Sequence, residues 1–78
     1  MVISFVMIST RPSMEKKVYN RLKKNQKIVE MHPLFGEFDL IVKIEGKDYD
    51  EIGKFVIDNI RSIDGVLNTQ TLSGISLK

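Results

Sequence analysis

The pattern of apolar and polar residues along the chain predicts six elements. Short runs that are rich in β-branched residues, or that alternate with a period of two, are typical of strands, and apolar residues three or four positions apart are typical of amphipathic helices. By these criteria we expect the order strand, helix, strand, strand, helix, strand. The expected ranges are residues 2–8, 13–25, 28–34, 38–44, 48–63 and 66–77.

Local signals indicate where the two helices begin and end. Ser13 is expected to cap the first helix, and Asn25, which tolerates a left-handed backbone, is expected to end it. The second helix is expected to begin with a capping box formed by Asp48 and Glu51. Its apolar spacing continues as far as Ile63, so we expect one continuous helix up to that residue.

The order of the elements predicts an α+β fold of the ferredoxin-like βαββαβ type, with a four-stranded antiparallel sheet and two helices on one face. The first and third strands are the most apolar and are expected at the centre of the sheet. Pro33 in the second strand, and Asn68 with Gln70 in the last, favour edge positions for these two. We also expect a bend or bulge at Gly74.

The first strand is apolar on both of its sides, which has a consequence for assembly. Two helices can cover only one face of a sheet, and soluble monomers avoid a large exposed apolar face. A second copy stacked sheet to sheet is the simplest cover, so the sequence predicts a dimer. The side chains on one side are Ile3, Phe5 and Met7, and those on the other are Val2, Val6 and Ile8.

Composition narrows the class of protein. A chain of 78 residues is one domain and is short enough that a partner subunit would help to stabilise it. Without cysteine it has neither disulfides nor thiolate metal sites, and we expect no cofactor. No apolar run is long enough to span a membrane, so we expect a cytoplasmic protein without a membrane partner. A net charge of +2 is too small to indicate nucleic acid as a partner.

Two charged features allow a functional and a structural interpretation. A basic segment around the first helix could contact nucleic-acid phosphates, but no base-reading motif accompanies it, and we favour a solvated helix face. His32, with Glu30 or Asp39, could act as a general base, although an edge-strand histidine near a turn explains it more simply. The basic residues are Lys16, Lys17, Arg21, Lys23, Lys24 and Lys27.

The turn FGEFD, residues 35–39, allows two interpretations as well. Gly36 could supply only the positive φ of a hairpin turn. A glycine also lets a ligand approach the backbone, and amide N–H groups beside a carboxylate suit a zwitterion, with Asp39 taking its ammonium group. In the last strand, Thr69 and Thr71 face the same side and offer hydroxyl groups.

Three segments stand out: VMISTRPS at residues 6–13, GEFDLIVKI at 36–44 and FVIDNIRSIDGVLNTQT at 55–71. Together they resemble a known family, the effector-binding (RAM) domain of the Lrp/AsnC, or feast/famine, transcriptional regulators. The resemblance implies sheet-to-sheet dimers that assemble into rings of eight or ten subunits, with free amino acids bound at subunit interfaces. It also implies effector-binding roles for Gly36, Glu37, Phe38 and Asp39, with Thr69, Gln70 and Thr71 as secondary candidates.

The sequence departs from the family pattern in two ways. Phe35 stands where the family often has a small hydroxylated residue. The chain also begins directly at the first strand, without the helix-turn-helix domain of the regulators. We therefore expect a single domain over residues 1–78 that does not bind operator DNA and that could co-assemble with full-length regulators.

Two alternatives to a non-catalytic amino-acid sensor stay open. One is a small enzyme of the dimeric α+β barrel type, which would use His32 with Glu30 or Asp39 for proton transfer. The other is a structural assembly module that binds no ligand.

Overall fold

The computed structural model of the chain describes residues 1–74, which form one sheet and one helical layer. The predicted element order is confirmed. The predicted end of the last strand, at residues 75–77, lies outside the described residues. The elements are β1 (Val2–Thr10), α1 (Glu15–Lys23), β2 (Ile28–Pro33), β3 (Leu40–Gly46), α2 (Tyr49–Phe55), the π-helical turn η1 (Val56–Ile60) and β4 (Val66–Ser73).

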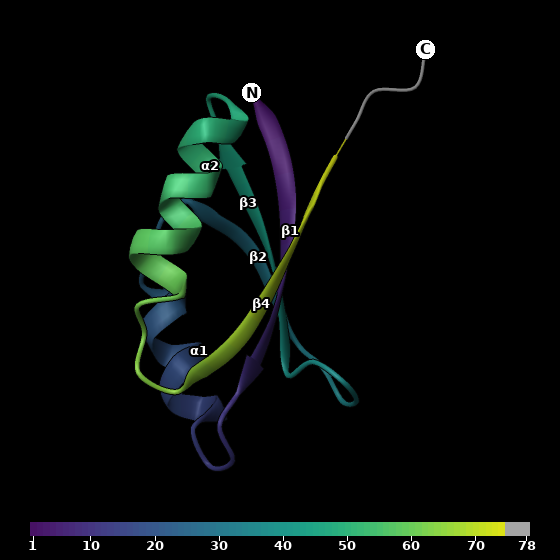
Figure 1. Ribbon diagram of the computed structural model, residues 1–78, viewed down its shortest axis with the longest axis vertical. Coiled ribbons are helices and arrows are strands. Elements are labelled where there is room, and N and C mark those ends of the chain that lie inside the picture. The colour runs from purple at the N-terminus through teal and green to yellow at the C-terminus, as the bar shows by residue number, and fades with distance from the viewer. Residues whose placement is uncertain (75–78) are drawn as a thin grey trace.

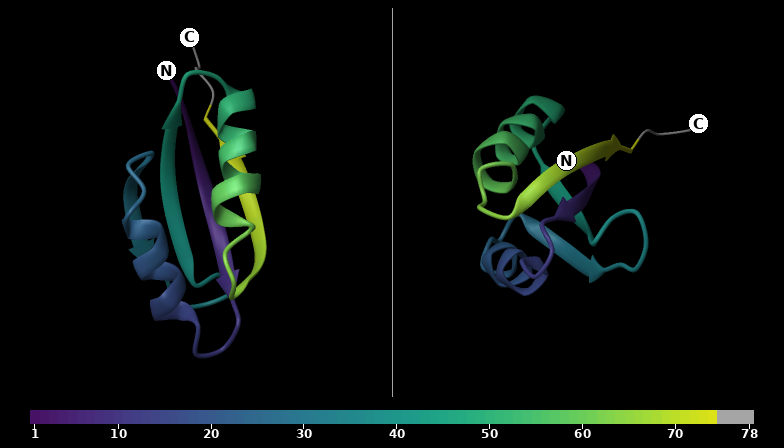
Figure 2. Two further views of the ribbon diagram at one scale, coloured as in Figure 1. Left: turned by 90° about the vertical axis from the view of Figure 1, so that its left-hand side faces the viewer. Right: turned by 60° about the horizontal axis from the view of Figure 1, so that its bottom comes forward.

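The four strands form one antiparallel sheet in the order β2-β3-β1-β4, so the predicted central strands β1 and β3 do lie at the centre. Phe5 of β1 pairs with Lys43 of β3 on one side and with Leu72 of β4 on the other. Both helical segments lie on one face of the sheet (Figures 1 and 2). The predicted ferredoxin-like βαββαβ fold is therefore confirmed.

The core lies between the helices and the face of the sheet that they cover. Alternation along β1 places every second side chain there, and Val6 and Ile8 have no exposed surface. Val18 and Leu22 of α1, four residues apart, are buried against the same core. The remaining buried apolar residues are Leu40, Val42, Ile44, Ile52, Phe55, Val56 and Ile60.

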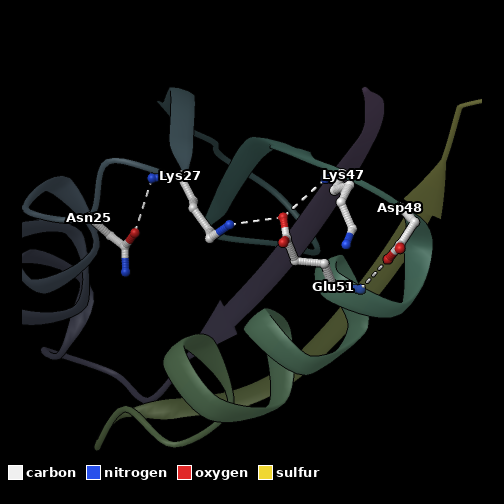
Figure 3. Close-up of polar contacts among 5 residues, drawn as sticks. All are labelled: Asn25, Lys27, Lys47, Asp48 and Glu51. Carbon is white, nitrogen blue, oxygen red and sulfur yellow. Dashed lines mark hydrogen bonds and ion pairs between the residues drawn. The ribbon is translucent and has the colours of Figure 1, made fainter.

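The start of α2 is fixed by the predicted cap (Figure 3). The Glu51 N–H donates to Asp48 Oδ1 at 2.9 Å, as in a capping box. The Glu51 carboxylate accepts from the Lys47 N–H at 3.0 Å and from Lys27 Nζ at 2.9 Å. Because Lys27 lies just before β2, this contact connects the start of α2 to the chain that follows α1. The two bonds lower the pKa of Glu51, the Lys27 bond most.

The predicted cap of the first helix is wrong. Ser13 has a φ of +74°, and α1 begins at Glu15 without a side-chain cap at Met14. The Met14 N–H donates to the Arg11 carbonyl at 3.0 Å, so residues 11–14 form a tight turn. Its second residue is a proline and its third has positive φ, as in a type II turn. The turn uses Ser13 for its backbone conformation rather than for its hydroxyl group.

The second helix is not continuous, so the prediction of one helix up to Ile63 is wrong. After Phe55 it widens into η1, and Ile63 lies in the turn beyond it. The Arg61 N–H donates to the carbonyl of Val56, five residues earlier, at 2.8 Å. The helical spacing of the buried residues is still confirmed as far as Ile60.

The bend or bulge that was predicted at Gly74 is not found there. The Gly74 N–H still donates to the Ile3 carbonyl at 2.9 Å, and the register between β1 and β4 shifts between Ser9 and Thr10. A bulge increases the local twist of a strand and re-aims its side chains. This one lies next to the turn between β2 and β3.

Candidate functional site

The turn between β2 and β3, residues 34–39, projects from the sheet on the side away from the helices (Figure 1). Its base is closed by backbone bonds, because the Leu34 N–H donates to the Asp39 carbonyl and the Asp39 N–H to the Ile8 carbonyl, both at 2.8 Å. Gly36 has a φ of +143°, a conformation that side chains disfavour, and the space around its Cα is open. The turn thus exposes its backbone.

The carboxylate of Asp39 fastens this turn to the end of β1. Its Oδ2 accepts from the Thr10 N–H at 2.8 Å and from Thr10 Oγ1 at 3.2 Å. The Thr10 N–H lies at the bulge, so Asp39 satisfies a backbone donor that the irregular ladder leaves there. Oδ1 of Asp39 forms no hydrogen bond within residues 1–74, so one carboxylate oxygen is open to a ligand.

The tip of the turn carries backbone donors without an internal acceptor. Within residues 1–74, the N–H groups of residues 35–38 donate to no protein atom. The Glu37 carbonyl, in contrast, accepts from Ser9 Oγ at 3.4 Å. Backbone N–H groups without an internal acceptor can donate to a carboxylate or another anion.

A hollow of about 600 Å³ lies between the turn and β4. It brings together four of the seven candidate residues, Glu37 and Phe38 from the turn with Thr69 and Gln70 from β4. Ser9 and Asn68, which pair across β1 and β4, complete its lining. We call it the β4 hollow.

Two other candidates, Gly36 and Asp39, line a different hollow of about 550 Å³ on the α1 side of the same turn. We call it the α1 hollow, and its other lining residues are Glu15, Lys16, Tyr19, Pro33, Leu34, Phe35 and Leu40. The seventh candidate, Thr71, lines neither hollow. Thr69 and Thr71 do share a side of β4, since they pair with Ile8 and Val6, but Gln70 between them faces the opposite side.

Sequence reasoning missed three residues of this region, Ser9, Thr10 and Asn68. The available signal was that Ser9 continues the series Ile3, Phe5 and Met7, whose side chains share one side of β1, and that Thr10 follows it. Nothing in the sequence, however, indicated that β4 and the turn meet at that end of β1.

His32 shows no catalytic arrangement. It is exposed on edge strand β2, with Nε2 3.4 Å from Glu30 Oε1, and Lys43 Nζ lies 3.3 Å from the other Glu30 oxygen. These contacts, the His32 hydrogen bond most, lower the pKa of Glu30. Residues 1–74 contain no cluster of three or more His, Asp or Glu side chains that could hold a metal ion.

The basic segment is partly neutralised by the fold. Lys17 Nζ lies 3.2 Å from Asp64 and Lys27 Nζ lies 2.9 Å from Glu51. Its other charged side chains are exposed around α1, as expected for a solvated helix face. Among the described residues, no helix is both long enough and apolar enough to cross a bilayer.

Comparison with known proteins agrees with the fold. The family model of the Lrp/AsnC ligand-binding domain matches residues 3–76. The regulator FL11 of Pyrococcus furiosus, named as an HTH-type transcriptional regulator, is 32% identical over 71 residues, which are 91% of this chain and 46% of that protein. The chain thus spans about half the length of this regulator.

Two solved structures extend the comparison. FFRP-DM1 is 29% identical with a TM-score of 0.91, and the match covers 96% of this chain and all of that one. A transcriptional regulator of Neisseria meningitidis, solved as a complex with L-Met, has a TM-score of 0.86. At 21% identity, over 96% of this chain and 50% of that one, it is similar in fold alone.

The family model and the regulator sequences cover almost the entire chain, including the turn and β4. They are ligand-binding domains of transcriptional regulators and not enzymes, so the interpretation as a small enzyme loses its support. The chain belongs to the Lrp/AsnC ligand-binding domain family.

Proposed function

We propose that this domain binds a free amino acid at a subunit interface and links its binding to assembly, without catalysing a reaction. The observation that carries the proposal is the β4 hollow, where backbone donors of the turn and polar side chains of β4 line one space. Membership of a ligand-binding family supports it, as does a relative of the same fold solved with L-Met.

The chemistry around the turn matches an amino-acid zwitterion. The free N–H groups of Glu37 and Phe38 and the amides of Asn68 and Gln70 supply donors for the α-carboxylate. Glu37 supplies an acceptor for the α-ammonium group, while Phe38 supplies apolar surface. Asp39, on the α1 side of the turn, would act by holding the turn against Thr10. Gly36 keeps the backbone accessible. Thr69 lines the same hollow, whereas Thr71 becomes the weakest of the seven candidates.

The subunit interface in this proposal is the open face of the sheet. We define it by its apolar residues Ile3, Phe5, Met7, Ile41 and Leu72, of which Phe5 is 38% and Leu72 is 47% exposed. No helix covers this side among residues 1–74 (Figure 2). A second copy stacked on it would bury these side chains. The β4 hollow lies at the end of the same face, beside Ser9, so a partner subunit would close it.

Assembly of such dimers into rings of eight or ten subunits is part of the proposal. Residues 1–74 include no helix-turn-helix unit, because α1 and α2 both pack on the sheet. We propose that the domain does not contact operator DNA and acts by joining full-length regulators in mixed assemblies. We also propose a cytoplasmic location, which is supported by relatives that are named as transcriptional regulators.

Calorimetric titration and thermal unfolding with each of the twenty amino acids test the proposal. We expect binding of one or a few of them and a Tm that rises with ligand concentration. Glu37→Gln should abolish binding with assembly size unchanged, since it removes the charge that would pair with the α-ammonium group and keeps the length of the side chain. Asp50→Asn, which removes an exposed carboxylate of α2, is the matched control. If no amino acid binds, the domain is a structural assembly module.

A further inference from the structure

Three basic side chains lie on one side of α1. Lys17, Arg21 and Lys24 follow one another at intervals of four and three residues, so they share one face of the helix. Like charges at this spacing repel one another. Lys17 is paired with Asp64 at 3.2 Å, but Arg21 and Lys24 belong to no ion pair within residues 1–74. The fold thus keeps two cations side by side without an internal counter-charge.

The three cations line a groove between α1 and the end of η1, which we call the α1–η1 groove. It consists of two adjoining hollows of about 520 Å³ and about 280 Å³. Both have Arg21, Lys24, Ser62 and Ile63 in their linings. Because both helical segments lie on one face of the sheet, the groove belongs to the helical layer, away from the open face (Figure 2). The larger hollow has the volume of a small-molecule site.

The larger hollow suits a phosphate group. Its lining holds three cations and one carboxylate, that of Asp64. This carboxylate is already bound by Arg11 at 2.9 Å and by Lys17 at 3.2 Å. Arg21 and Lys24 therefore have no anion in this hollow to neutralise them. A guanidinium group binds phosphate oxygens through two parallel hydrogen bonds, and an ammonium group binds them as a point charge.

The smaller hollow has a different chemistry, which suits a nucleobase. The Asp58 carboxylate lines it and belongs to no ion pair within residues 1–74. Asn59 adds an amide that both donates and accepts, while Leu22 and Ile63 add apolar surface against which a flat ring can lie. Guanine matches this lining, because its ring N–H and its amino group are adjacent donors that one carboxylate accepts together.

We propose that the α1–η1 groove binds a guanine nucleotide, with its phosphate on Arg21 and Lys24 and its base on Asp58. The ligand carries an anion at one end and N–H donors at the other, as the two hollows require. The reverse orientation would place the phosphate beside the Asp58 carboxylate, where like charges repel. The groove requires neither the β4 hollow nor a second subunit, so the inference goes beyond the proposed amino-acid binding.

Calorimetric titration with guanosine 5′-monophosphate (GMP) at low ionic strength tests the phosphate contacts. We expect Arg21→Gln and Lys24→Gln each to raise the dissociation constant about three- to tenfold, as for charge-assisted hydrogen bonds in a solvated groove. Lys23→Gln is the matched control, because Lys23 belongs to the same helix but lines neither hollow, and it should have no effect. Circular dichroism of each variant checks that the fold is retained.

Ribose 5-phosphate, which carries the phosphate without the base, tests the contact with Asp58. Asp58→Asn should weaken the binding of GMP and leave the binding of ribose 5-phosphate unchanged. If Asp58→Asn strengthens the binding of both, the phosphate lies beside this carboxylate and the proposed orientation is overturned. Ribose 5-phosphate that binds as tightly as GMP overturns the base contact.

Three further outcomes decide the inference. It is overturned if GMP does not bind, or if neither Arg21→Gln nor Lys24→Gln weakens GMP binding. It is also overturned if only a single-stranded oligonucleotide binds, since the basic side chains then contact a nucleic-acid backbone. Amino-acid binding should be normal in Arg21→Gln, because Arg21 lies outside the β4 hollow. A chain that binds GMP but no amino acid supports this inference and contradicts the proposed function.

Discussion

The two faces of the sheet divide the residues of one strand into two sets with different roles. On β1, Ser4, Val6 and Ile8 are completely buried beneath the helices, whereas Phe5, between them in sequence, is 38% exposed on the open face. Both sets are mainly apolar, so hydrophobicity does not distinguish them. The helices do, because they reach only one side. The same strand therefore supplies the core of a subunit and an exposed apolar surface.

The polar residues of the two faces differ as well. Among residues 1–74, the polar residues buried on the covered face are Ser4 and Thr10. On the open face, the apolar cluster adjoins a polar strip on β2 and β3, where Glu30 lies between His32 and Lys43. An apolar centre with a polar rim is the usual composition of a subunit interface. The comparison thus assigns the stability of the fold to one face and leaves the other as the proposed surface for association.

The largest expected effect belongs to the covered face. Ile8→Ala removes a side chain with no exposed surface and should lower the free energy of unfolding by about 2–5 kcal/mol. Urea denaturation measures this loss, and Met7→Ala, which changes the partly buried neighbour on the open face, is the control. Equal losses in the two variants would show that both faces contribute alike to the fold.

A charge on the open face should act on association instead. Phe5→Glu should raise the dissociation constant of the dimer at least about 100-fold, because a carboxylate would be buried between two apolar sheets. The chain should stay folded, since Phe5 is outside the core of its subunit. Analytical ultracentrifugation with far-UV circular dichroism measures both. Ile57→Glu on η1 should leave the dimer intact, and a Phe5→Glu dimer of normal affinity would exclude this face as the interface.

The smallest expected effect concerns the polar strip and pH. Contacts with His32 and Lys43 lower the pKa of Glu30 in the folded state. The ionised Glu30 side chain therefore stabilises the fold at pH values above its usual pKa of 4.5. That contribution is lost as the pH falls through the lowered pKa. Thermal unfolding at pH 7 should show the wild type slightly more stable than Glu30→Gln, and the difference should vanish in acid. A difference that persists below the folded pKa contradicts the assignment.

How much of the fold could be predicted depends on how local each signal is. Alternation in β1 and β3 and the acidic pair at the start of α2 are set by neighbouring residues, and the structure confirms them. Ser13 was misassigned because its hydroxyl suits a cap while its backbone is needed for a turn. The π-helical turn after Phe55 leaves no signature, since its wider spacing still buries the same apolar residues.

The candidate site was predictable only in part. The glycine and acids of the turn are visible in the sequence, but their division between two hollows follows from packing. Asp39, expected as a ligand-binding carboxylate, holds Thr10 at the bulge. That contact depends on the end of β1, which lies 29 residues earlier in the chain.

The sequence by itself determined the order of the elements, the central strands and the need for a cover on both faces of β1, because these depend on side-chain periodicity. Only the tertiary structure decided that the helices bury Val6 and Ile8 and leave Phe5 exposed, and that β4 meets the turn beside Ser9. The reason is physical. Periodicity indicates which side chains share a face of the sheet. The residues that pack against each face depend instead on how distant strands pair and on which side the helices lie.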